Sequence, residues 1–545
     1  MTDNSRALVP VGETWDHRTH MRGEIAMWRP PLVSADVDIA AGFNANKARA
    51  RDLALTDPYA TNSAQIKRDA IVGRKFRLAL MPDAEYLGVD FDAADEWASL
   101  AEAEFERFAE GVTFDADAAR KNTFTFMLHT VQEGLHSEGE ALGIVRAKEG
   151  PYGYMTCLQL IEPERLDQPV GFQTRAPNGN EIRYGVERDE YGEPIAYHIR
   201  DTHPTDVRWN DPKKQNKVRR IERYQEHGRP QVLHVMDDYR PGMSRGVSRE
   251  MLASLKRIKM LQTFSDAELG RAILQATWAA VIESELDYEQ AMKVLGMSGA
   301  DAYGNNLTAA AADHLRNVAP YYRELGLKFN GASVAHLMPG EKLNVVQGAI
   351  NGVAYNEFST AMVRQISAAL GVSYEDLSRD FSSTSYSAAR QSLATIWRHY
   401  MRQRAMLVVK FCMPFVSAWM QEAILTKRLP MLGNRFKATE EGFARARPGL
   451  CVGDFISWSK PVIDPVKERT GQHMAMALGL STVRDEAATE GEDYTKLLRQ
   501  RAREVRLREE LGLNPAGYDQ SLVIGGGSKA GNPQEERKAR SDGPG

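Results

Sequence analysis

Apolar and polar positions follow a helical period over much of the first part of the chain. Between residues 44 and 70 apolar side chains recur every three or four positions, and Asp57-Pro58 marks the start of a second helix, since proline suits a first turn. Residues 91–110 and 123–138 predict two more helices, and the apolar side of the first is expected to carry Trp97, Leu100, Phe105 and Phe108. The run IVGRKFRLAL before them is typical of a strand.

The pattern changes near Ala141. The short runs that follow are rich in β-branched and aromatic residues, and each predicts one strand: ALGIVRA, YMTCLQLI, NEIRYGVERD, PIAYHIRD and PQVLHVMDD. Turn residues separate them, including Pro177-Asn178-Gly179 and Tyr191-Gly192. We expect a β-rich segment that ends near Arg240.

Helical patterns return after this segment. The Ser248 side chain is expected to cap one or two long helices that run to about Glu285, and a further helix is expected over 307–325. A strand pair should turn at Pro339-Gly340, and a helix should follow over 353–370.

A polar stretch over 378–387 precedes the longest helical pattern. This pattern covers 386–426, which would form a helix about 60 Å long, kinked at Pro414. One side carries Tyr386, Leu393, Trp397, Tyr400, Val408 and Phe411, and the other carries Gln391, Thr395, Arg398 and Arg402. Residues 464–513 are again helical in pattern. The predicted fold class is therefore α+β and mainly helical.

Composition and charge narrow the function. The 545 residues are 43% apolar and carry a formal net charge of −4, whereas a protein that binds nucleic acid by overall charge is usually basic. Any contact with DNA must be local or loose. The most apolar run, MLVVKFCMPFVSAWM, is interrupted by Lys410 and Pro414, so we expect no membrane span and no export signal. Cys157, Cys412 and Cys451 lack the spacing of a zinc site and are expected to be reduced thiols.

Two motifs of enzyme chemistry are missing from the sequence. It contains no GxxxxGK[ST] or HExxH pattern, which disfavours a packaging motor and a zinc protease. His129 and His136 could share a helix face with Glu133, but a solvated or buried face explains them better than a metal site. His234 and His336 lie in strand-like runs and are expected to be packed residues. We therefore expect no catalytic residue, no metal and no cofactor.

Eight stretches together resemble the lambda-type family of phage portal proteins. In chain order they are FNANKARARDLALTDPYATNSAQIKRDAIVG, EIRYGVERDEYGEPIAYHI, HVMDDYRPGMSRGVS, ESELD, HLMPGEKL, RQISAALGVSYEDLSRDFSSTSYSAARQS, IDPVKER and LGLSTVRDEAATEGEDY. Each is weak alone, but they keep the family's order from Phe43 to Tyr494, and the stretch Tyr386–Arg390 is the most specific.

The resemblance implies the portal architecture of wing, stem, clip and crown. The expected parts are a flexible arm (1–30), a wing (31–245), stem helices with the clip (246–330), a wing return (331–377), a tunnel loop with the long kinked helix (378–430), a crown (431–522) and a disordered tail (523–545). It also implies a ring of about twelve subunits at one capsid vertex of the virion, assembled in the host bacterial cytoplasm. The implied partners are terminase, a head–tail connector protein, a major capsid or scaffold protein, and double-stranded DNA in transit.

Candidate functional residues follow from this placement. The tunnel loop would present Ser382, Ser383, Thr384 and Ser385 to the channel. Basic residues near the loop and on the first stem helix are candidates for contact with passing DNA: Arg379, Arg390, Arg398, Arg402, Lys256 and Arg257. Arg404 lies in the same cluster. A solvated face or salt bridges between subunits would explain the same charges.

Two other functions fit the chain less well. A DNA-processing enzyme, such as a nuclease or motor subunit, would need the nucleotide-binding or metal-ligand motifs that are missing. A capsid shell or adaptor protein would assemble into sheets or icosahedra, whereas a portal forms isolated rings with a central hole.

Overall fold

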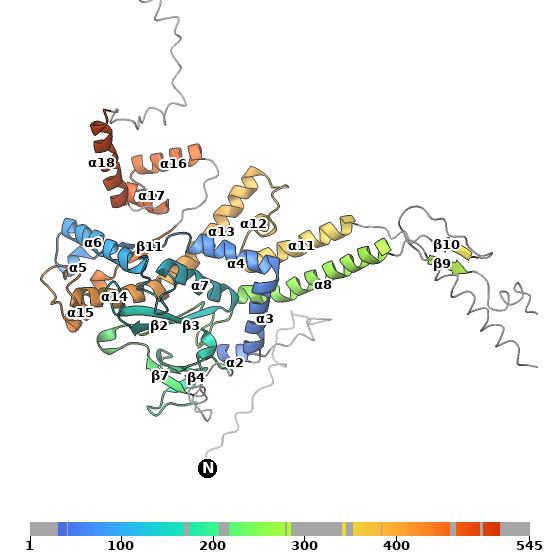
Figure 1. Cartoon of the computed structure of the whole chain (residues 1–545), viewed down its shortest axis with the longest axis horizontal. Coiled ribbons are helices and arrows are strands. Elements are labelled where there is room, and N and C mark those ends of the chain that lie inside the picture. The colour runs from blue at the N-terminus through green and yellow to red at the C-terminus, as the bar shows by residue number, and fades with distance from the viewer. Residues whose placement is uncertain are drawn as a thin grey trace, which may run out of the picture. The chain divides into compact units, whose positions relative to one another are not determined.

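The structure is a computed structural model that describes residues 31–40, 42–167, 174–206, 217–277, 281–284, 341–344, 352–382, 384–457, 465–490 and 494–512 (Figure 1). The chain divides into two compact units. The first contains residues up to Leu255 and from Ser367 onward, and the second contains Lys256–Ile366.

The first unit begins with helices. The sequence predicts α3 (Phe43–Thr56), α4 (Pro58–Ile71), α6 (Phe91–Ala109) and α7 (Phe124–Ser137), and the structure adds two short helices, α2 (Ala35–Ala40) and α5 (Ala84–Leu87). The predicted break at Asp57-Pro58 is confirmed, because the Asp57 carboxylate accepts hydrogen bonds from the backbone N–H groups of Tyr59 and Ala60 at 3.0 and 2.9 Å.

Helix α6 confirms most of its predicted apolar side. Trp97, Phe105 and Phe108 are buried, but Leu100 is 45% exposed, so its predicted position is wrong. The buried stripe continues instead through Ala101, which is fully buried and lies four residues after Trp97.

Antiparallel strands follow the helices. A three-stranded sheet has the order β3-β2-β8, formed by β2 (Glu140–Ala147), β3 (Thr156–Ile161) and β8 (Val232–Met236). A four-stranded sheet has the order β4-β5-β6-β7, formed by β4 (Glu181–Arg183), β5 (Val186–Arg188), β6 (Pro194–Arg200) and β7 (Val218–Glu222). Short 3-10 turns, Pro163–Arg165 and Glu226–Gly228, lie between strands.

The four-stranded sheet differs from the sequence prediction in two ways. NEIRYGVERD does not form one strand, because Tyr184 and Gly185 adopt positive φ angles of 49° and 82° and turn the chain between β4 and β5. Strand β7 was not predicted, since its sequence VRRIE is mostly charged and only Ile221 is buried.

The predicted long helix has three parts. Helix α13 (Tyr386–Leu407) continues through a π-helical turn (Val408–Cys412) into α14 (Met413–Leu425). The π turn lets Pro414 fall in the first turn of α14, where a missing N–H costs nothing. The helical stretch Ser387–Leu425 is long and apolar enough to cross a membrane by composition, but 72% of its most apolar window is buried inside the protein.

Helix α14 forms the centre of the main core. The Trp419 ring packs edge-on against Phe105 at 5.0 Å and stacks with Phe108 at 6.0 Å. Phe124 of α7 stacks on Phe415 at 5.1 Å. This core combines α6, α7 and the three-stranded sheet with segments from far along the chain.

The segment after α14 returns to the same core. Helix α15 (Glu440–Leu450) buries Phe443 and Leu450, and β11 (Gly453–Ile456) pairs antiparallel with β1 (Arg77–Leu80), with Leu80 opposite Gly453. Phe455 stacks on Phe76 at 4.9 Å. The remaining described helices are α12 (Tyr374–Ser378), α16 (Pro465–Ala477), α17 (Val483–Thr489) and α18 (Tyr494–Glu510).

The second unit contains most of α8 (Arg249–Thr277) and α11 (Gly352–Leu370). The Phe264 ring stacks on Tyr355 at 5.6 Å and meets Phe358 at 4.4 Å, which joins the two helices. The helix predicted over 353–370 is thus confirmed.

The second unit also holds a strand pair. The helix predicted to reach Glu285 ends early, because β9 (Val281–Ser284) is a strand that pairs antiparallel with β10 (Glu341–Asn344). β-branched Val281 and Ile282 favour the strand. The helix predicted at 307–325, the turn at Pro339-Gly340 and His336 lie outside the described residues.

Candidate functional site

The loop between α12 and α13 is held by short-range polar contacts. Its first residue, Arg379, has a left-handed φ of 57° and donates to the Asn62 side chain at 2.8 Å. The Asp380 carboxylate accepts hydrogen bonds from the hydroxyl and backbone N–H of Ser382, which lower its pKa. Ser385 ends the loop by capping α13 through the N–H of Ala388 at 3.3 Å.

The predicted loop residues therefore differ from one another. Ser382 is exposed, Thr384 is half-buried and donates to Glu375 at 3.2 Å, and Ser385 caps a helix. Ser383 lies outside the described residues. Of these residues, Ser382 best fits a surface that faces solvent or a ligand.

The predicted polar side of α13 is exposed. Gln391, Thr395, Arg398 and Arg402 are all exposed, as is Arg390, whereas Leu393 and Trp397 are half-buried and Tyr400, Val408 and Phe411 are buried. The two sides of this helix are thus as predicted; only the side chain of Tyr386 lies outside the described part.

Arg404 is set apart from its neighbours on α13. Its guanidinium is half-buried and donates to the backbone carbonyls of Ala70 and Ile71, both at 2.8 Å. Burial lowers the pKa of Arg404 to about 10. It anchors α13 to the C-terminal end of α4 and is not a free cation.

Lys256 and Arg257, the remaining predicted basic residues, are exposed on α8. Both belong to the second unit, where the Arg257 side chain donates to Gln365 of α11 at 3.0 Å. Arg257 therefore has a helix-joining contact in addition to its charge.

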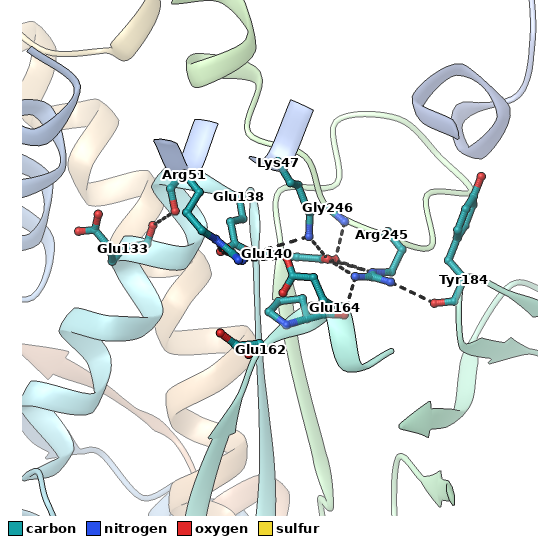
Figure 2. A network of polar contacts seen from close by, with 12 residues as sticks. Lys47, Arg51, Glu133, Glu138, Glu140, Glu162, Glu164, Tyr184, Arg245 and Gly246 are labelled. Atoms are coloured by element: carbon teal, nitrogen blue, oxygen red, sulfur yellow. Dashed lines mark hydrogen bonds and ion pairs between the residues drawn. The ribbon is translucent and has the colours of Figure 1, made fainter. Parts of the chain in front are cut away.

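A buried carboxylate, Glu140, occupies the junction of β2 with the approach to α8 (Figure 2). It receives Lys47 of α3 at 2.5 Å, the guanidinium of Arg245 at 2.7 and 2.9 Å, and the N–H of Gly246 at 2.8 Å. His234 of β8 lies 3.0 Å from its second oxygen. The Glu140 side chain is 0% exposed, and Lys47 and Arg245 are 5% and 4% exposed.

The charge balance fixes the ionisation of Glu140. Burial by itself would raise its pKa, but Arg245, Lys47 and His234 outweigh that effect and hold the pKa well below its usual value. The carboxylate is thus an anion that joins α3, β2, β8 and the chain before α8.

Close backbone approach makes this junction possible. Gly139 has a φ of +87°, and a Cβ there would lie 2.1 Å from the carbonyl carbon of Val247. A Cβ on Gly246 would lie 2.3 Å from the Gly139 carbonyl oxygen. Ser248 then donates to the His136 carbonyl at 2.6 Å and caps α8 through the N–H of Met251, as predicted.

A second carboxylate, Glu250, holds the first turn of α8. It pairs with the fully buried Lys67 of α4 and receives His399 and Gln403 of α13, both at 3.1 Å. Its pKa is held well below the usual value, since Lys67 and the neighbouring histidines outweigh the effect of burial. The root of α8 is therefore joined to the same helix that carries the exposed arginines.

Sequence reasoning missed both carboxylates. The run Arg245-Gly246-Val247-Ser248 was recognised as a helix entry, but its partners lie more than a hundred residues earlier in the chain. The packed interpretation of His234 is confirmed by its contact with Glu140. His136 is likewise packed, 2.8 Å from the Ser63 hydroxyl, and His129 faces the Gly73 carbonyl at 3.0 Å.

Metal ligands were also sought within the described ranges, where no group of three His, Cys, Asp or Glu side chains could hold an ion. The three cysteines are free; Cys157 and Cys412 are buried and Cys451 is half-buried. The arrangement supplies rigid junctions and an exposed basic helix face.

Known proteins match the chain over most of its length. The family profile described as "Phage portal protein, lambda family" matches residues 21–404. The portal protein of Escherichia phage N15 is 31% identical over 524 residues, covering 95% of this chain and 94% of that protein. Portal protein B of Escherichia phage lambda is 31% identical over 502 residues, covering 91% of this chain and 90% of that protein. Among solved structures, the neck of the empty GTA particle is similar at 12% identity and a TM-score of 0.41, covering 85% of this chain and 95% of that one.

Proposed function

The chain belongs to the lambda family of phage portal proteins, which act in packaging the viral DNA, and we propose that its copies close into a ring of about twelve around a DNA channel. The observation that carries this proposal is the family match, which extends through the loop and most of α13. Ring closure requires that one patch of each copy meets a different patch on its neighbour.

The exposed side of α13 is the surface best suited to passing DNA. Arg390, Arg398 and Arg402 are exposed and make no hydrogen bond or ion pair within the described ranges. Contacts of this kind weaken as salt rises and let a duplex slide. Arg379 and Arg257 have protein partners and are weaker candidates.

Two junctions support the role of a stiff conduit. Glu140 and Glu250 hold the approach and the first turn of α8, the helix proposed to lead into the stem. Glu140 is buried, Glu250 is half-buried, and both are paired, so they stabilise the start of this helix, which suits a part that carries load between wing and stem.

The crown is proposed to begin after Ser457. Residues 431–456, which the sequence assigned to it, include Phe443, Leu450 and Phe455 of the main core. Helices α16, α17 and α18 then remain as crown candidates. Docking of terminase, a head–tail connector and a capsid or scaffold protein, and assembly in the host cytoplasm, are proposed on the same family basis.

Negative-stain electron microscopy of the purified full-length chain tests the proposal. We expect isolated rings with a central hole. Sheets or icosahedra would favour a shell protein, and a chain that stays monomeric at high concentration across salt and pH would refute the ring.

Assays of ATP hydrolysis and DNA cleavage distinguish a portal protein from a DNA-processing enzyme. Portal proteins are structural components of the virion, so purified rings should neither hydrolyse ATP nor cut DNA. If either activity co-purifies with the chain and not with contaminants, the proposed role as a DNA conduit is wrong and the protein is a motor or a nuclease.

A further inference from the structure

Helix α18 carries an unusual density of positive charge. In a chain with a net charge of −4, its 17 residues contain Lys496, Arg499, Arg501, Arg503, Arg506 and Arg508 against Glu504, Glu509 and Glu510. The helix lies beyond the main core, in the part of the chain proposed as crown.

Three of these arginines form one line, which we call the arginine ridge: Arg499, Arg503 and Arg506. Their spacing of four and three residues places them on one side of the helix, over a length of about 10 Å. All three are exposed. Tyr494 and Val505, on the other side, are half-buried, so the ridge points away from the side that packs.

Glu509 and Glu510 follow Arg506 by three and four residues, but neither pairs with the ridge in the part of the helix that is described. Within the part of the chain that the structure describes, none of the three side chains makes a hydrogen bond, an ion pair or a ring contact, whereas Arg501 and Arg508 on the same helix do. Glu504, the one acid in the middle of the helix, accepts instead from Gln500 at 3.1 Å.

We infer that the arginine ridge binds the phosphate backbone of double-stranded DNA, as a second DNA-contacting surface distinct from α13. The guanidinium is planar and matches phosphate oxygens with paired N–H groups. A duplex as long as the ridge carries about six phosphates, so three arginines find partners at any sequence. In a ring, each copy supplies one ridge, and several weak contacts together give a higher affinity for DNA than a single copy has.

This inference rests on the proposed ring, but its test is separate because ring formation is scored first by electron microscopy. Fluorescence anisotropy then measures the binding of a short mixed-sequence duplex to assembled full-length rings, over about 50 to 200 mM KCl. The test variant is Arg499→Glu/Arg503→Glu/Arg506→Glu. The control, with the same charge change on exposed residues elsewhere, is Arg49→Glu/Lys75→Glu/Lys121→Glu.

We expect the test variant to bind the duplex at least about tenfold more weakly than the wild type. The slope of the logarithm of the binding constant against the logarithm of the KCl concentration should fall in magnitude by about three for each engaged ridge, because three phosphate contacts are lost. The control should stay within about twofold, and an Arg→Lys triple should keep most of the binding. Equal loss in test and control, or no loss in the test variant, would overturn the inference.

A further variant covers the case in which the glutamates prevent assembly. Arg499→Gln/Arg503→Gln/Arg506→Gln removes charge without reversing it. Rings of this variant that bind DNA as the wild type does would overturn the inference. If the rings fail to form although the chain is folded by circular dichroism, the ridge contacts another copy of the chain and not DNA.

Discussion

Replacing Glu140 by glutamine should destabilise the protein more than any exposed charge change of the same kind. Every contact of this carboxylate comes from a donor: Lys47 reaches one oxygen, Gly246 and His234 reach the other, and Arg245 donates to both. A glutamine must turn its NH2 group toward one of these donor sets, so no orientation satisfies both.

The expected cost follows from burial. Lys47 and Arg245 are 5% and 4% exposed, so the change leaves two cations with too little counter-charge in a dry site. Breaking a buried pair in this way costs about 3–5 kcal/mol, a large share of the free energy of unfolding of a typical domain. Adding Lys47→Met to Glu140→Gln should recover part of the loss, with a coupling of about 0.5–3 kcal/mol.

Urea unfolding at one fixed protein concentration measures the effect, since assembly shifts apparent stability. Trp97 and Trp419 lie in the main core and report its loss by fluorescence. The matched control is Glu222→Gln, because Glu222 is 61% exposed beside Arg220 and such a pair contributes about 0–1 kcal/mol. A loss below about 1 kcal/mol for Glu140→Gln would refute the reasoning from burial.

The pH dependence gives an independent check. The pKa of Glu140 is held below its unfolded value of about 4.3, so the unfolded chain binds the proton first as pH falls. The stabilisation is therefore present above that value and is lost as pH falls through the folded pKa. The stability gap between wild type and Glu140→Gln should narrow below about pH 4.3; a gap that widens there contradicts the assignment.

Three further outcomes are expected. Arg390→Glu with Arg398→Glu should impair DNA packaging or genome retention more than ring assembly; loss of rings in electron microscopy would make these arginines interface residues instead. Arg404→Met should lower the free energy of unfolding by about 1–3 kcal/mol, since the carbonyls of the half-buried Ala70 and the buried Ile71 lose their donor, whereas Arg398→Met should stay within about 0.5 kcal/mol; equal shifts in the melting temperature would contradict this distinction. Phe105→Ala should cost about 3–5 kcal/mol by urea unfolding while Leu100→Ala costs under about 1 kcal/mol, and comparable losses would place Leu100 in the core after all.

Local patterns predicted most elements because local chemistry determines them. The helix start at Asp57-Pro58, the cap at Ser248 and the two sides of α13 depend on residues within a few positions of one another. The order of helices and strands in the first unit follows from the same short-range signals.

Features that depend on distant residues could not be read in this way. Strand β7 exists because β6 pairs with it, and its charged sequence gives no apolar alternation to find. The sequence of α6 does not show which of Leu100 and Ala101 is buried, because that depends on the elements that pack against the helix.

The basic cluster of α13 shows the same limit for the candidate site. Arg404 differs from Arg402 only because the end of α4 lies beside it. Nothing in the sequence distinguishes Glu140 from the other glutamates, because its partners Lys47 and Arg245 come close to it only in the folded protein.

The pairing of β1 with β11 has a consequence for synthesis of the chain. Leu80 meets Gly453 only after about 370 further residues have been added, which takes roughly 20 to 75 s at bacterial translation rates. Until then Phe76 lacks the ring of Phe455, and the apolar side of α6 has no α14 to cover it. The nascent chain must therefore keep its early helices from aggregating for most of translation, and a ribosome that stops before β11 releases a product that holding chaperones or proteases will recognise.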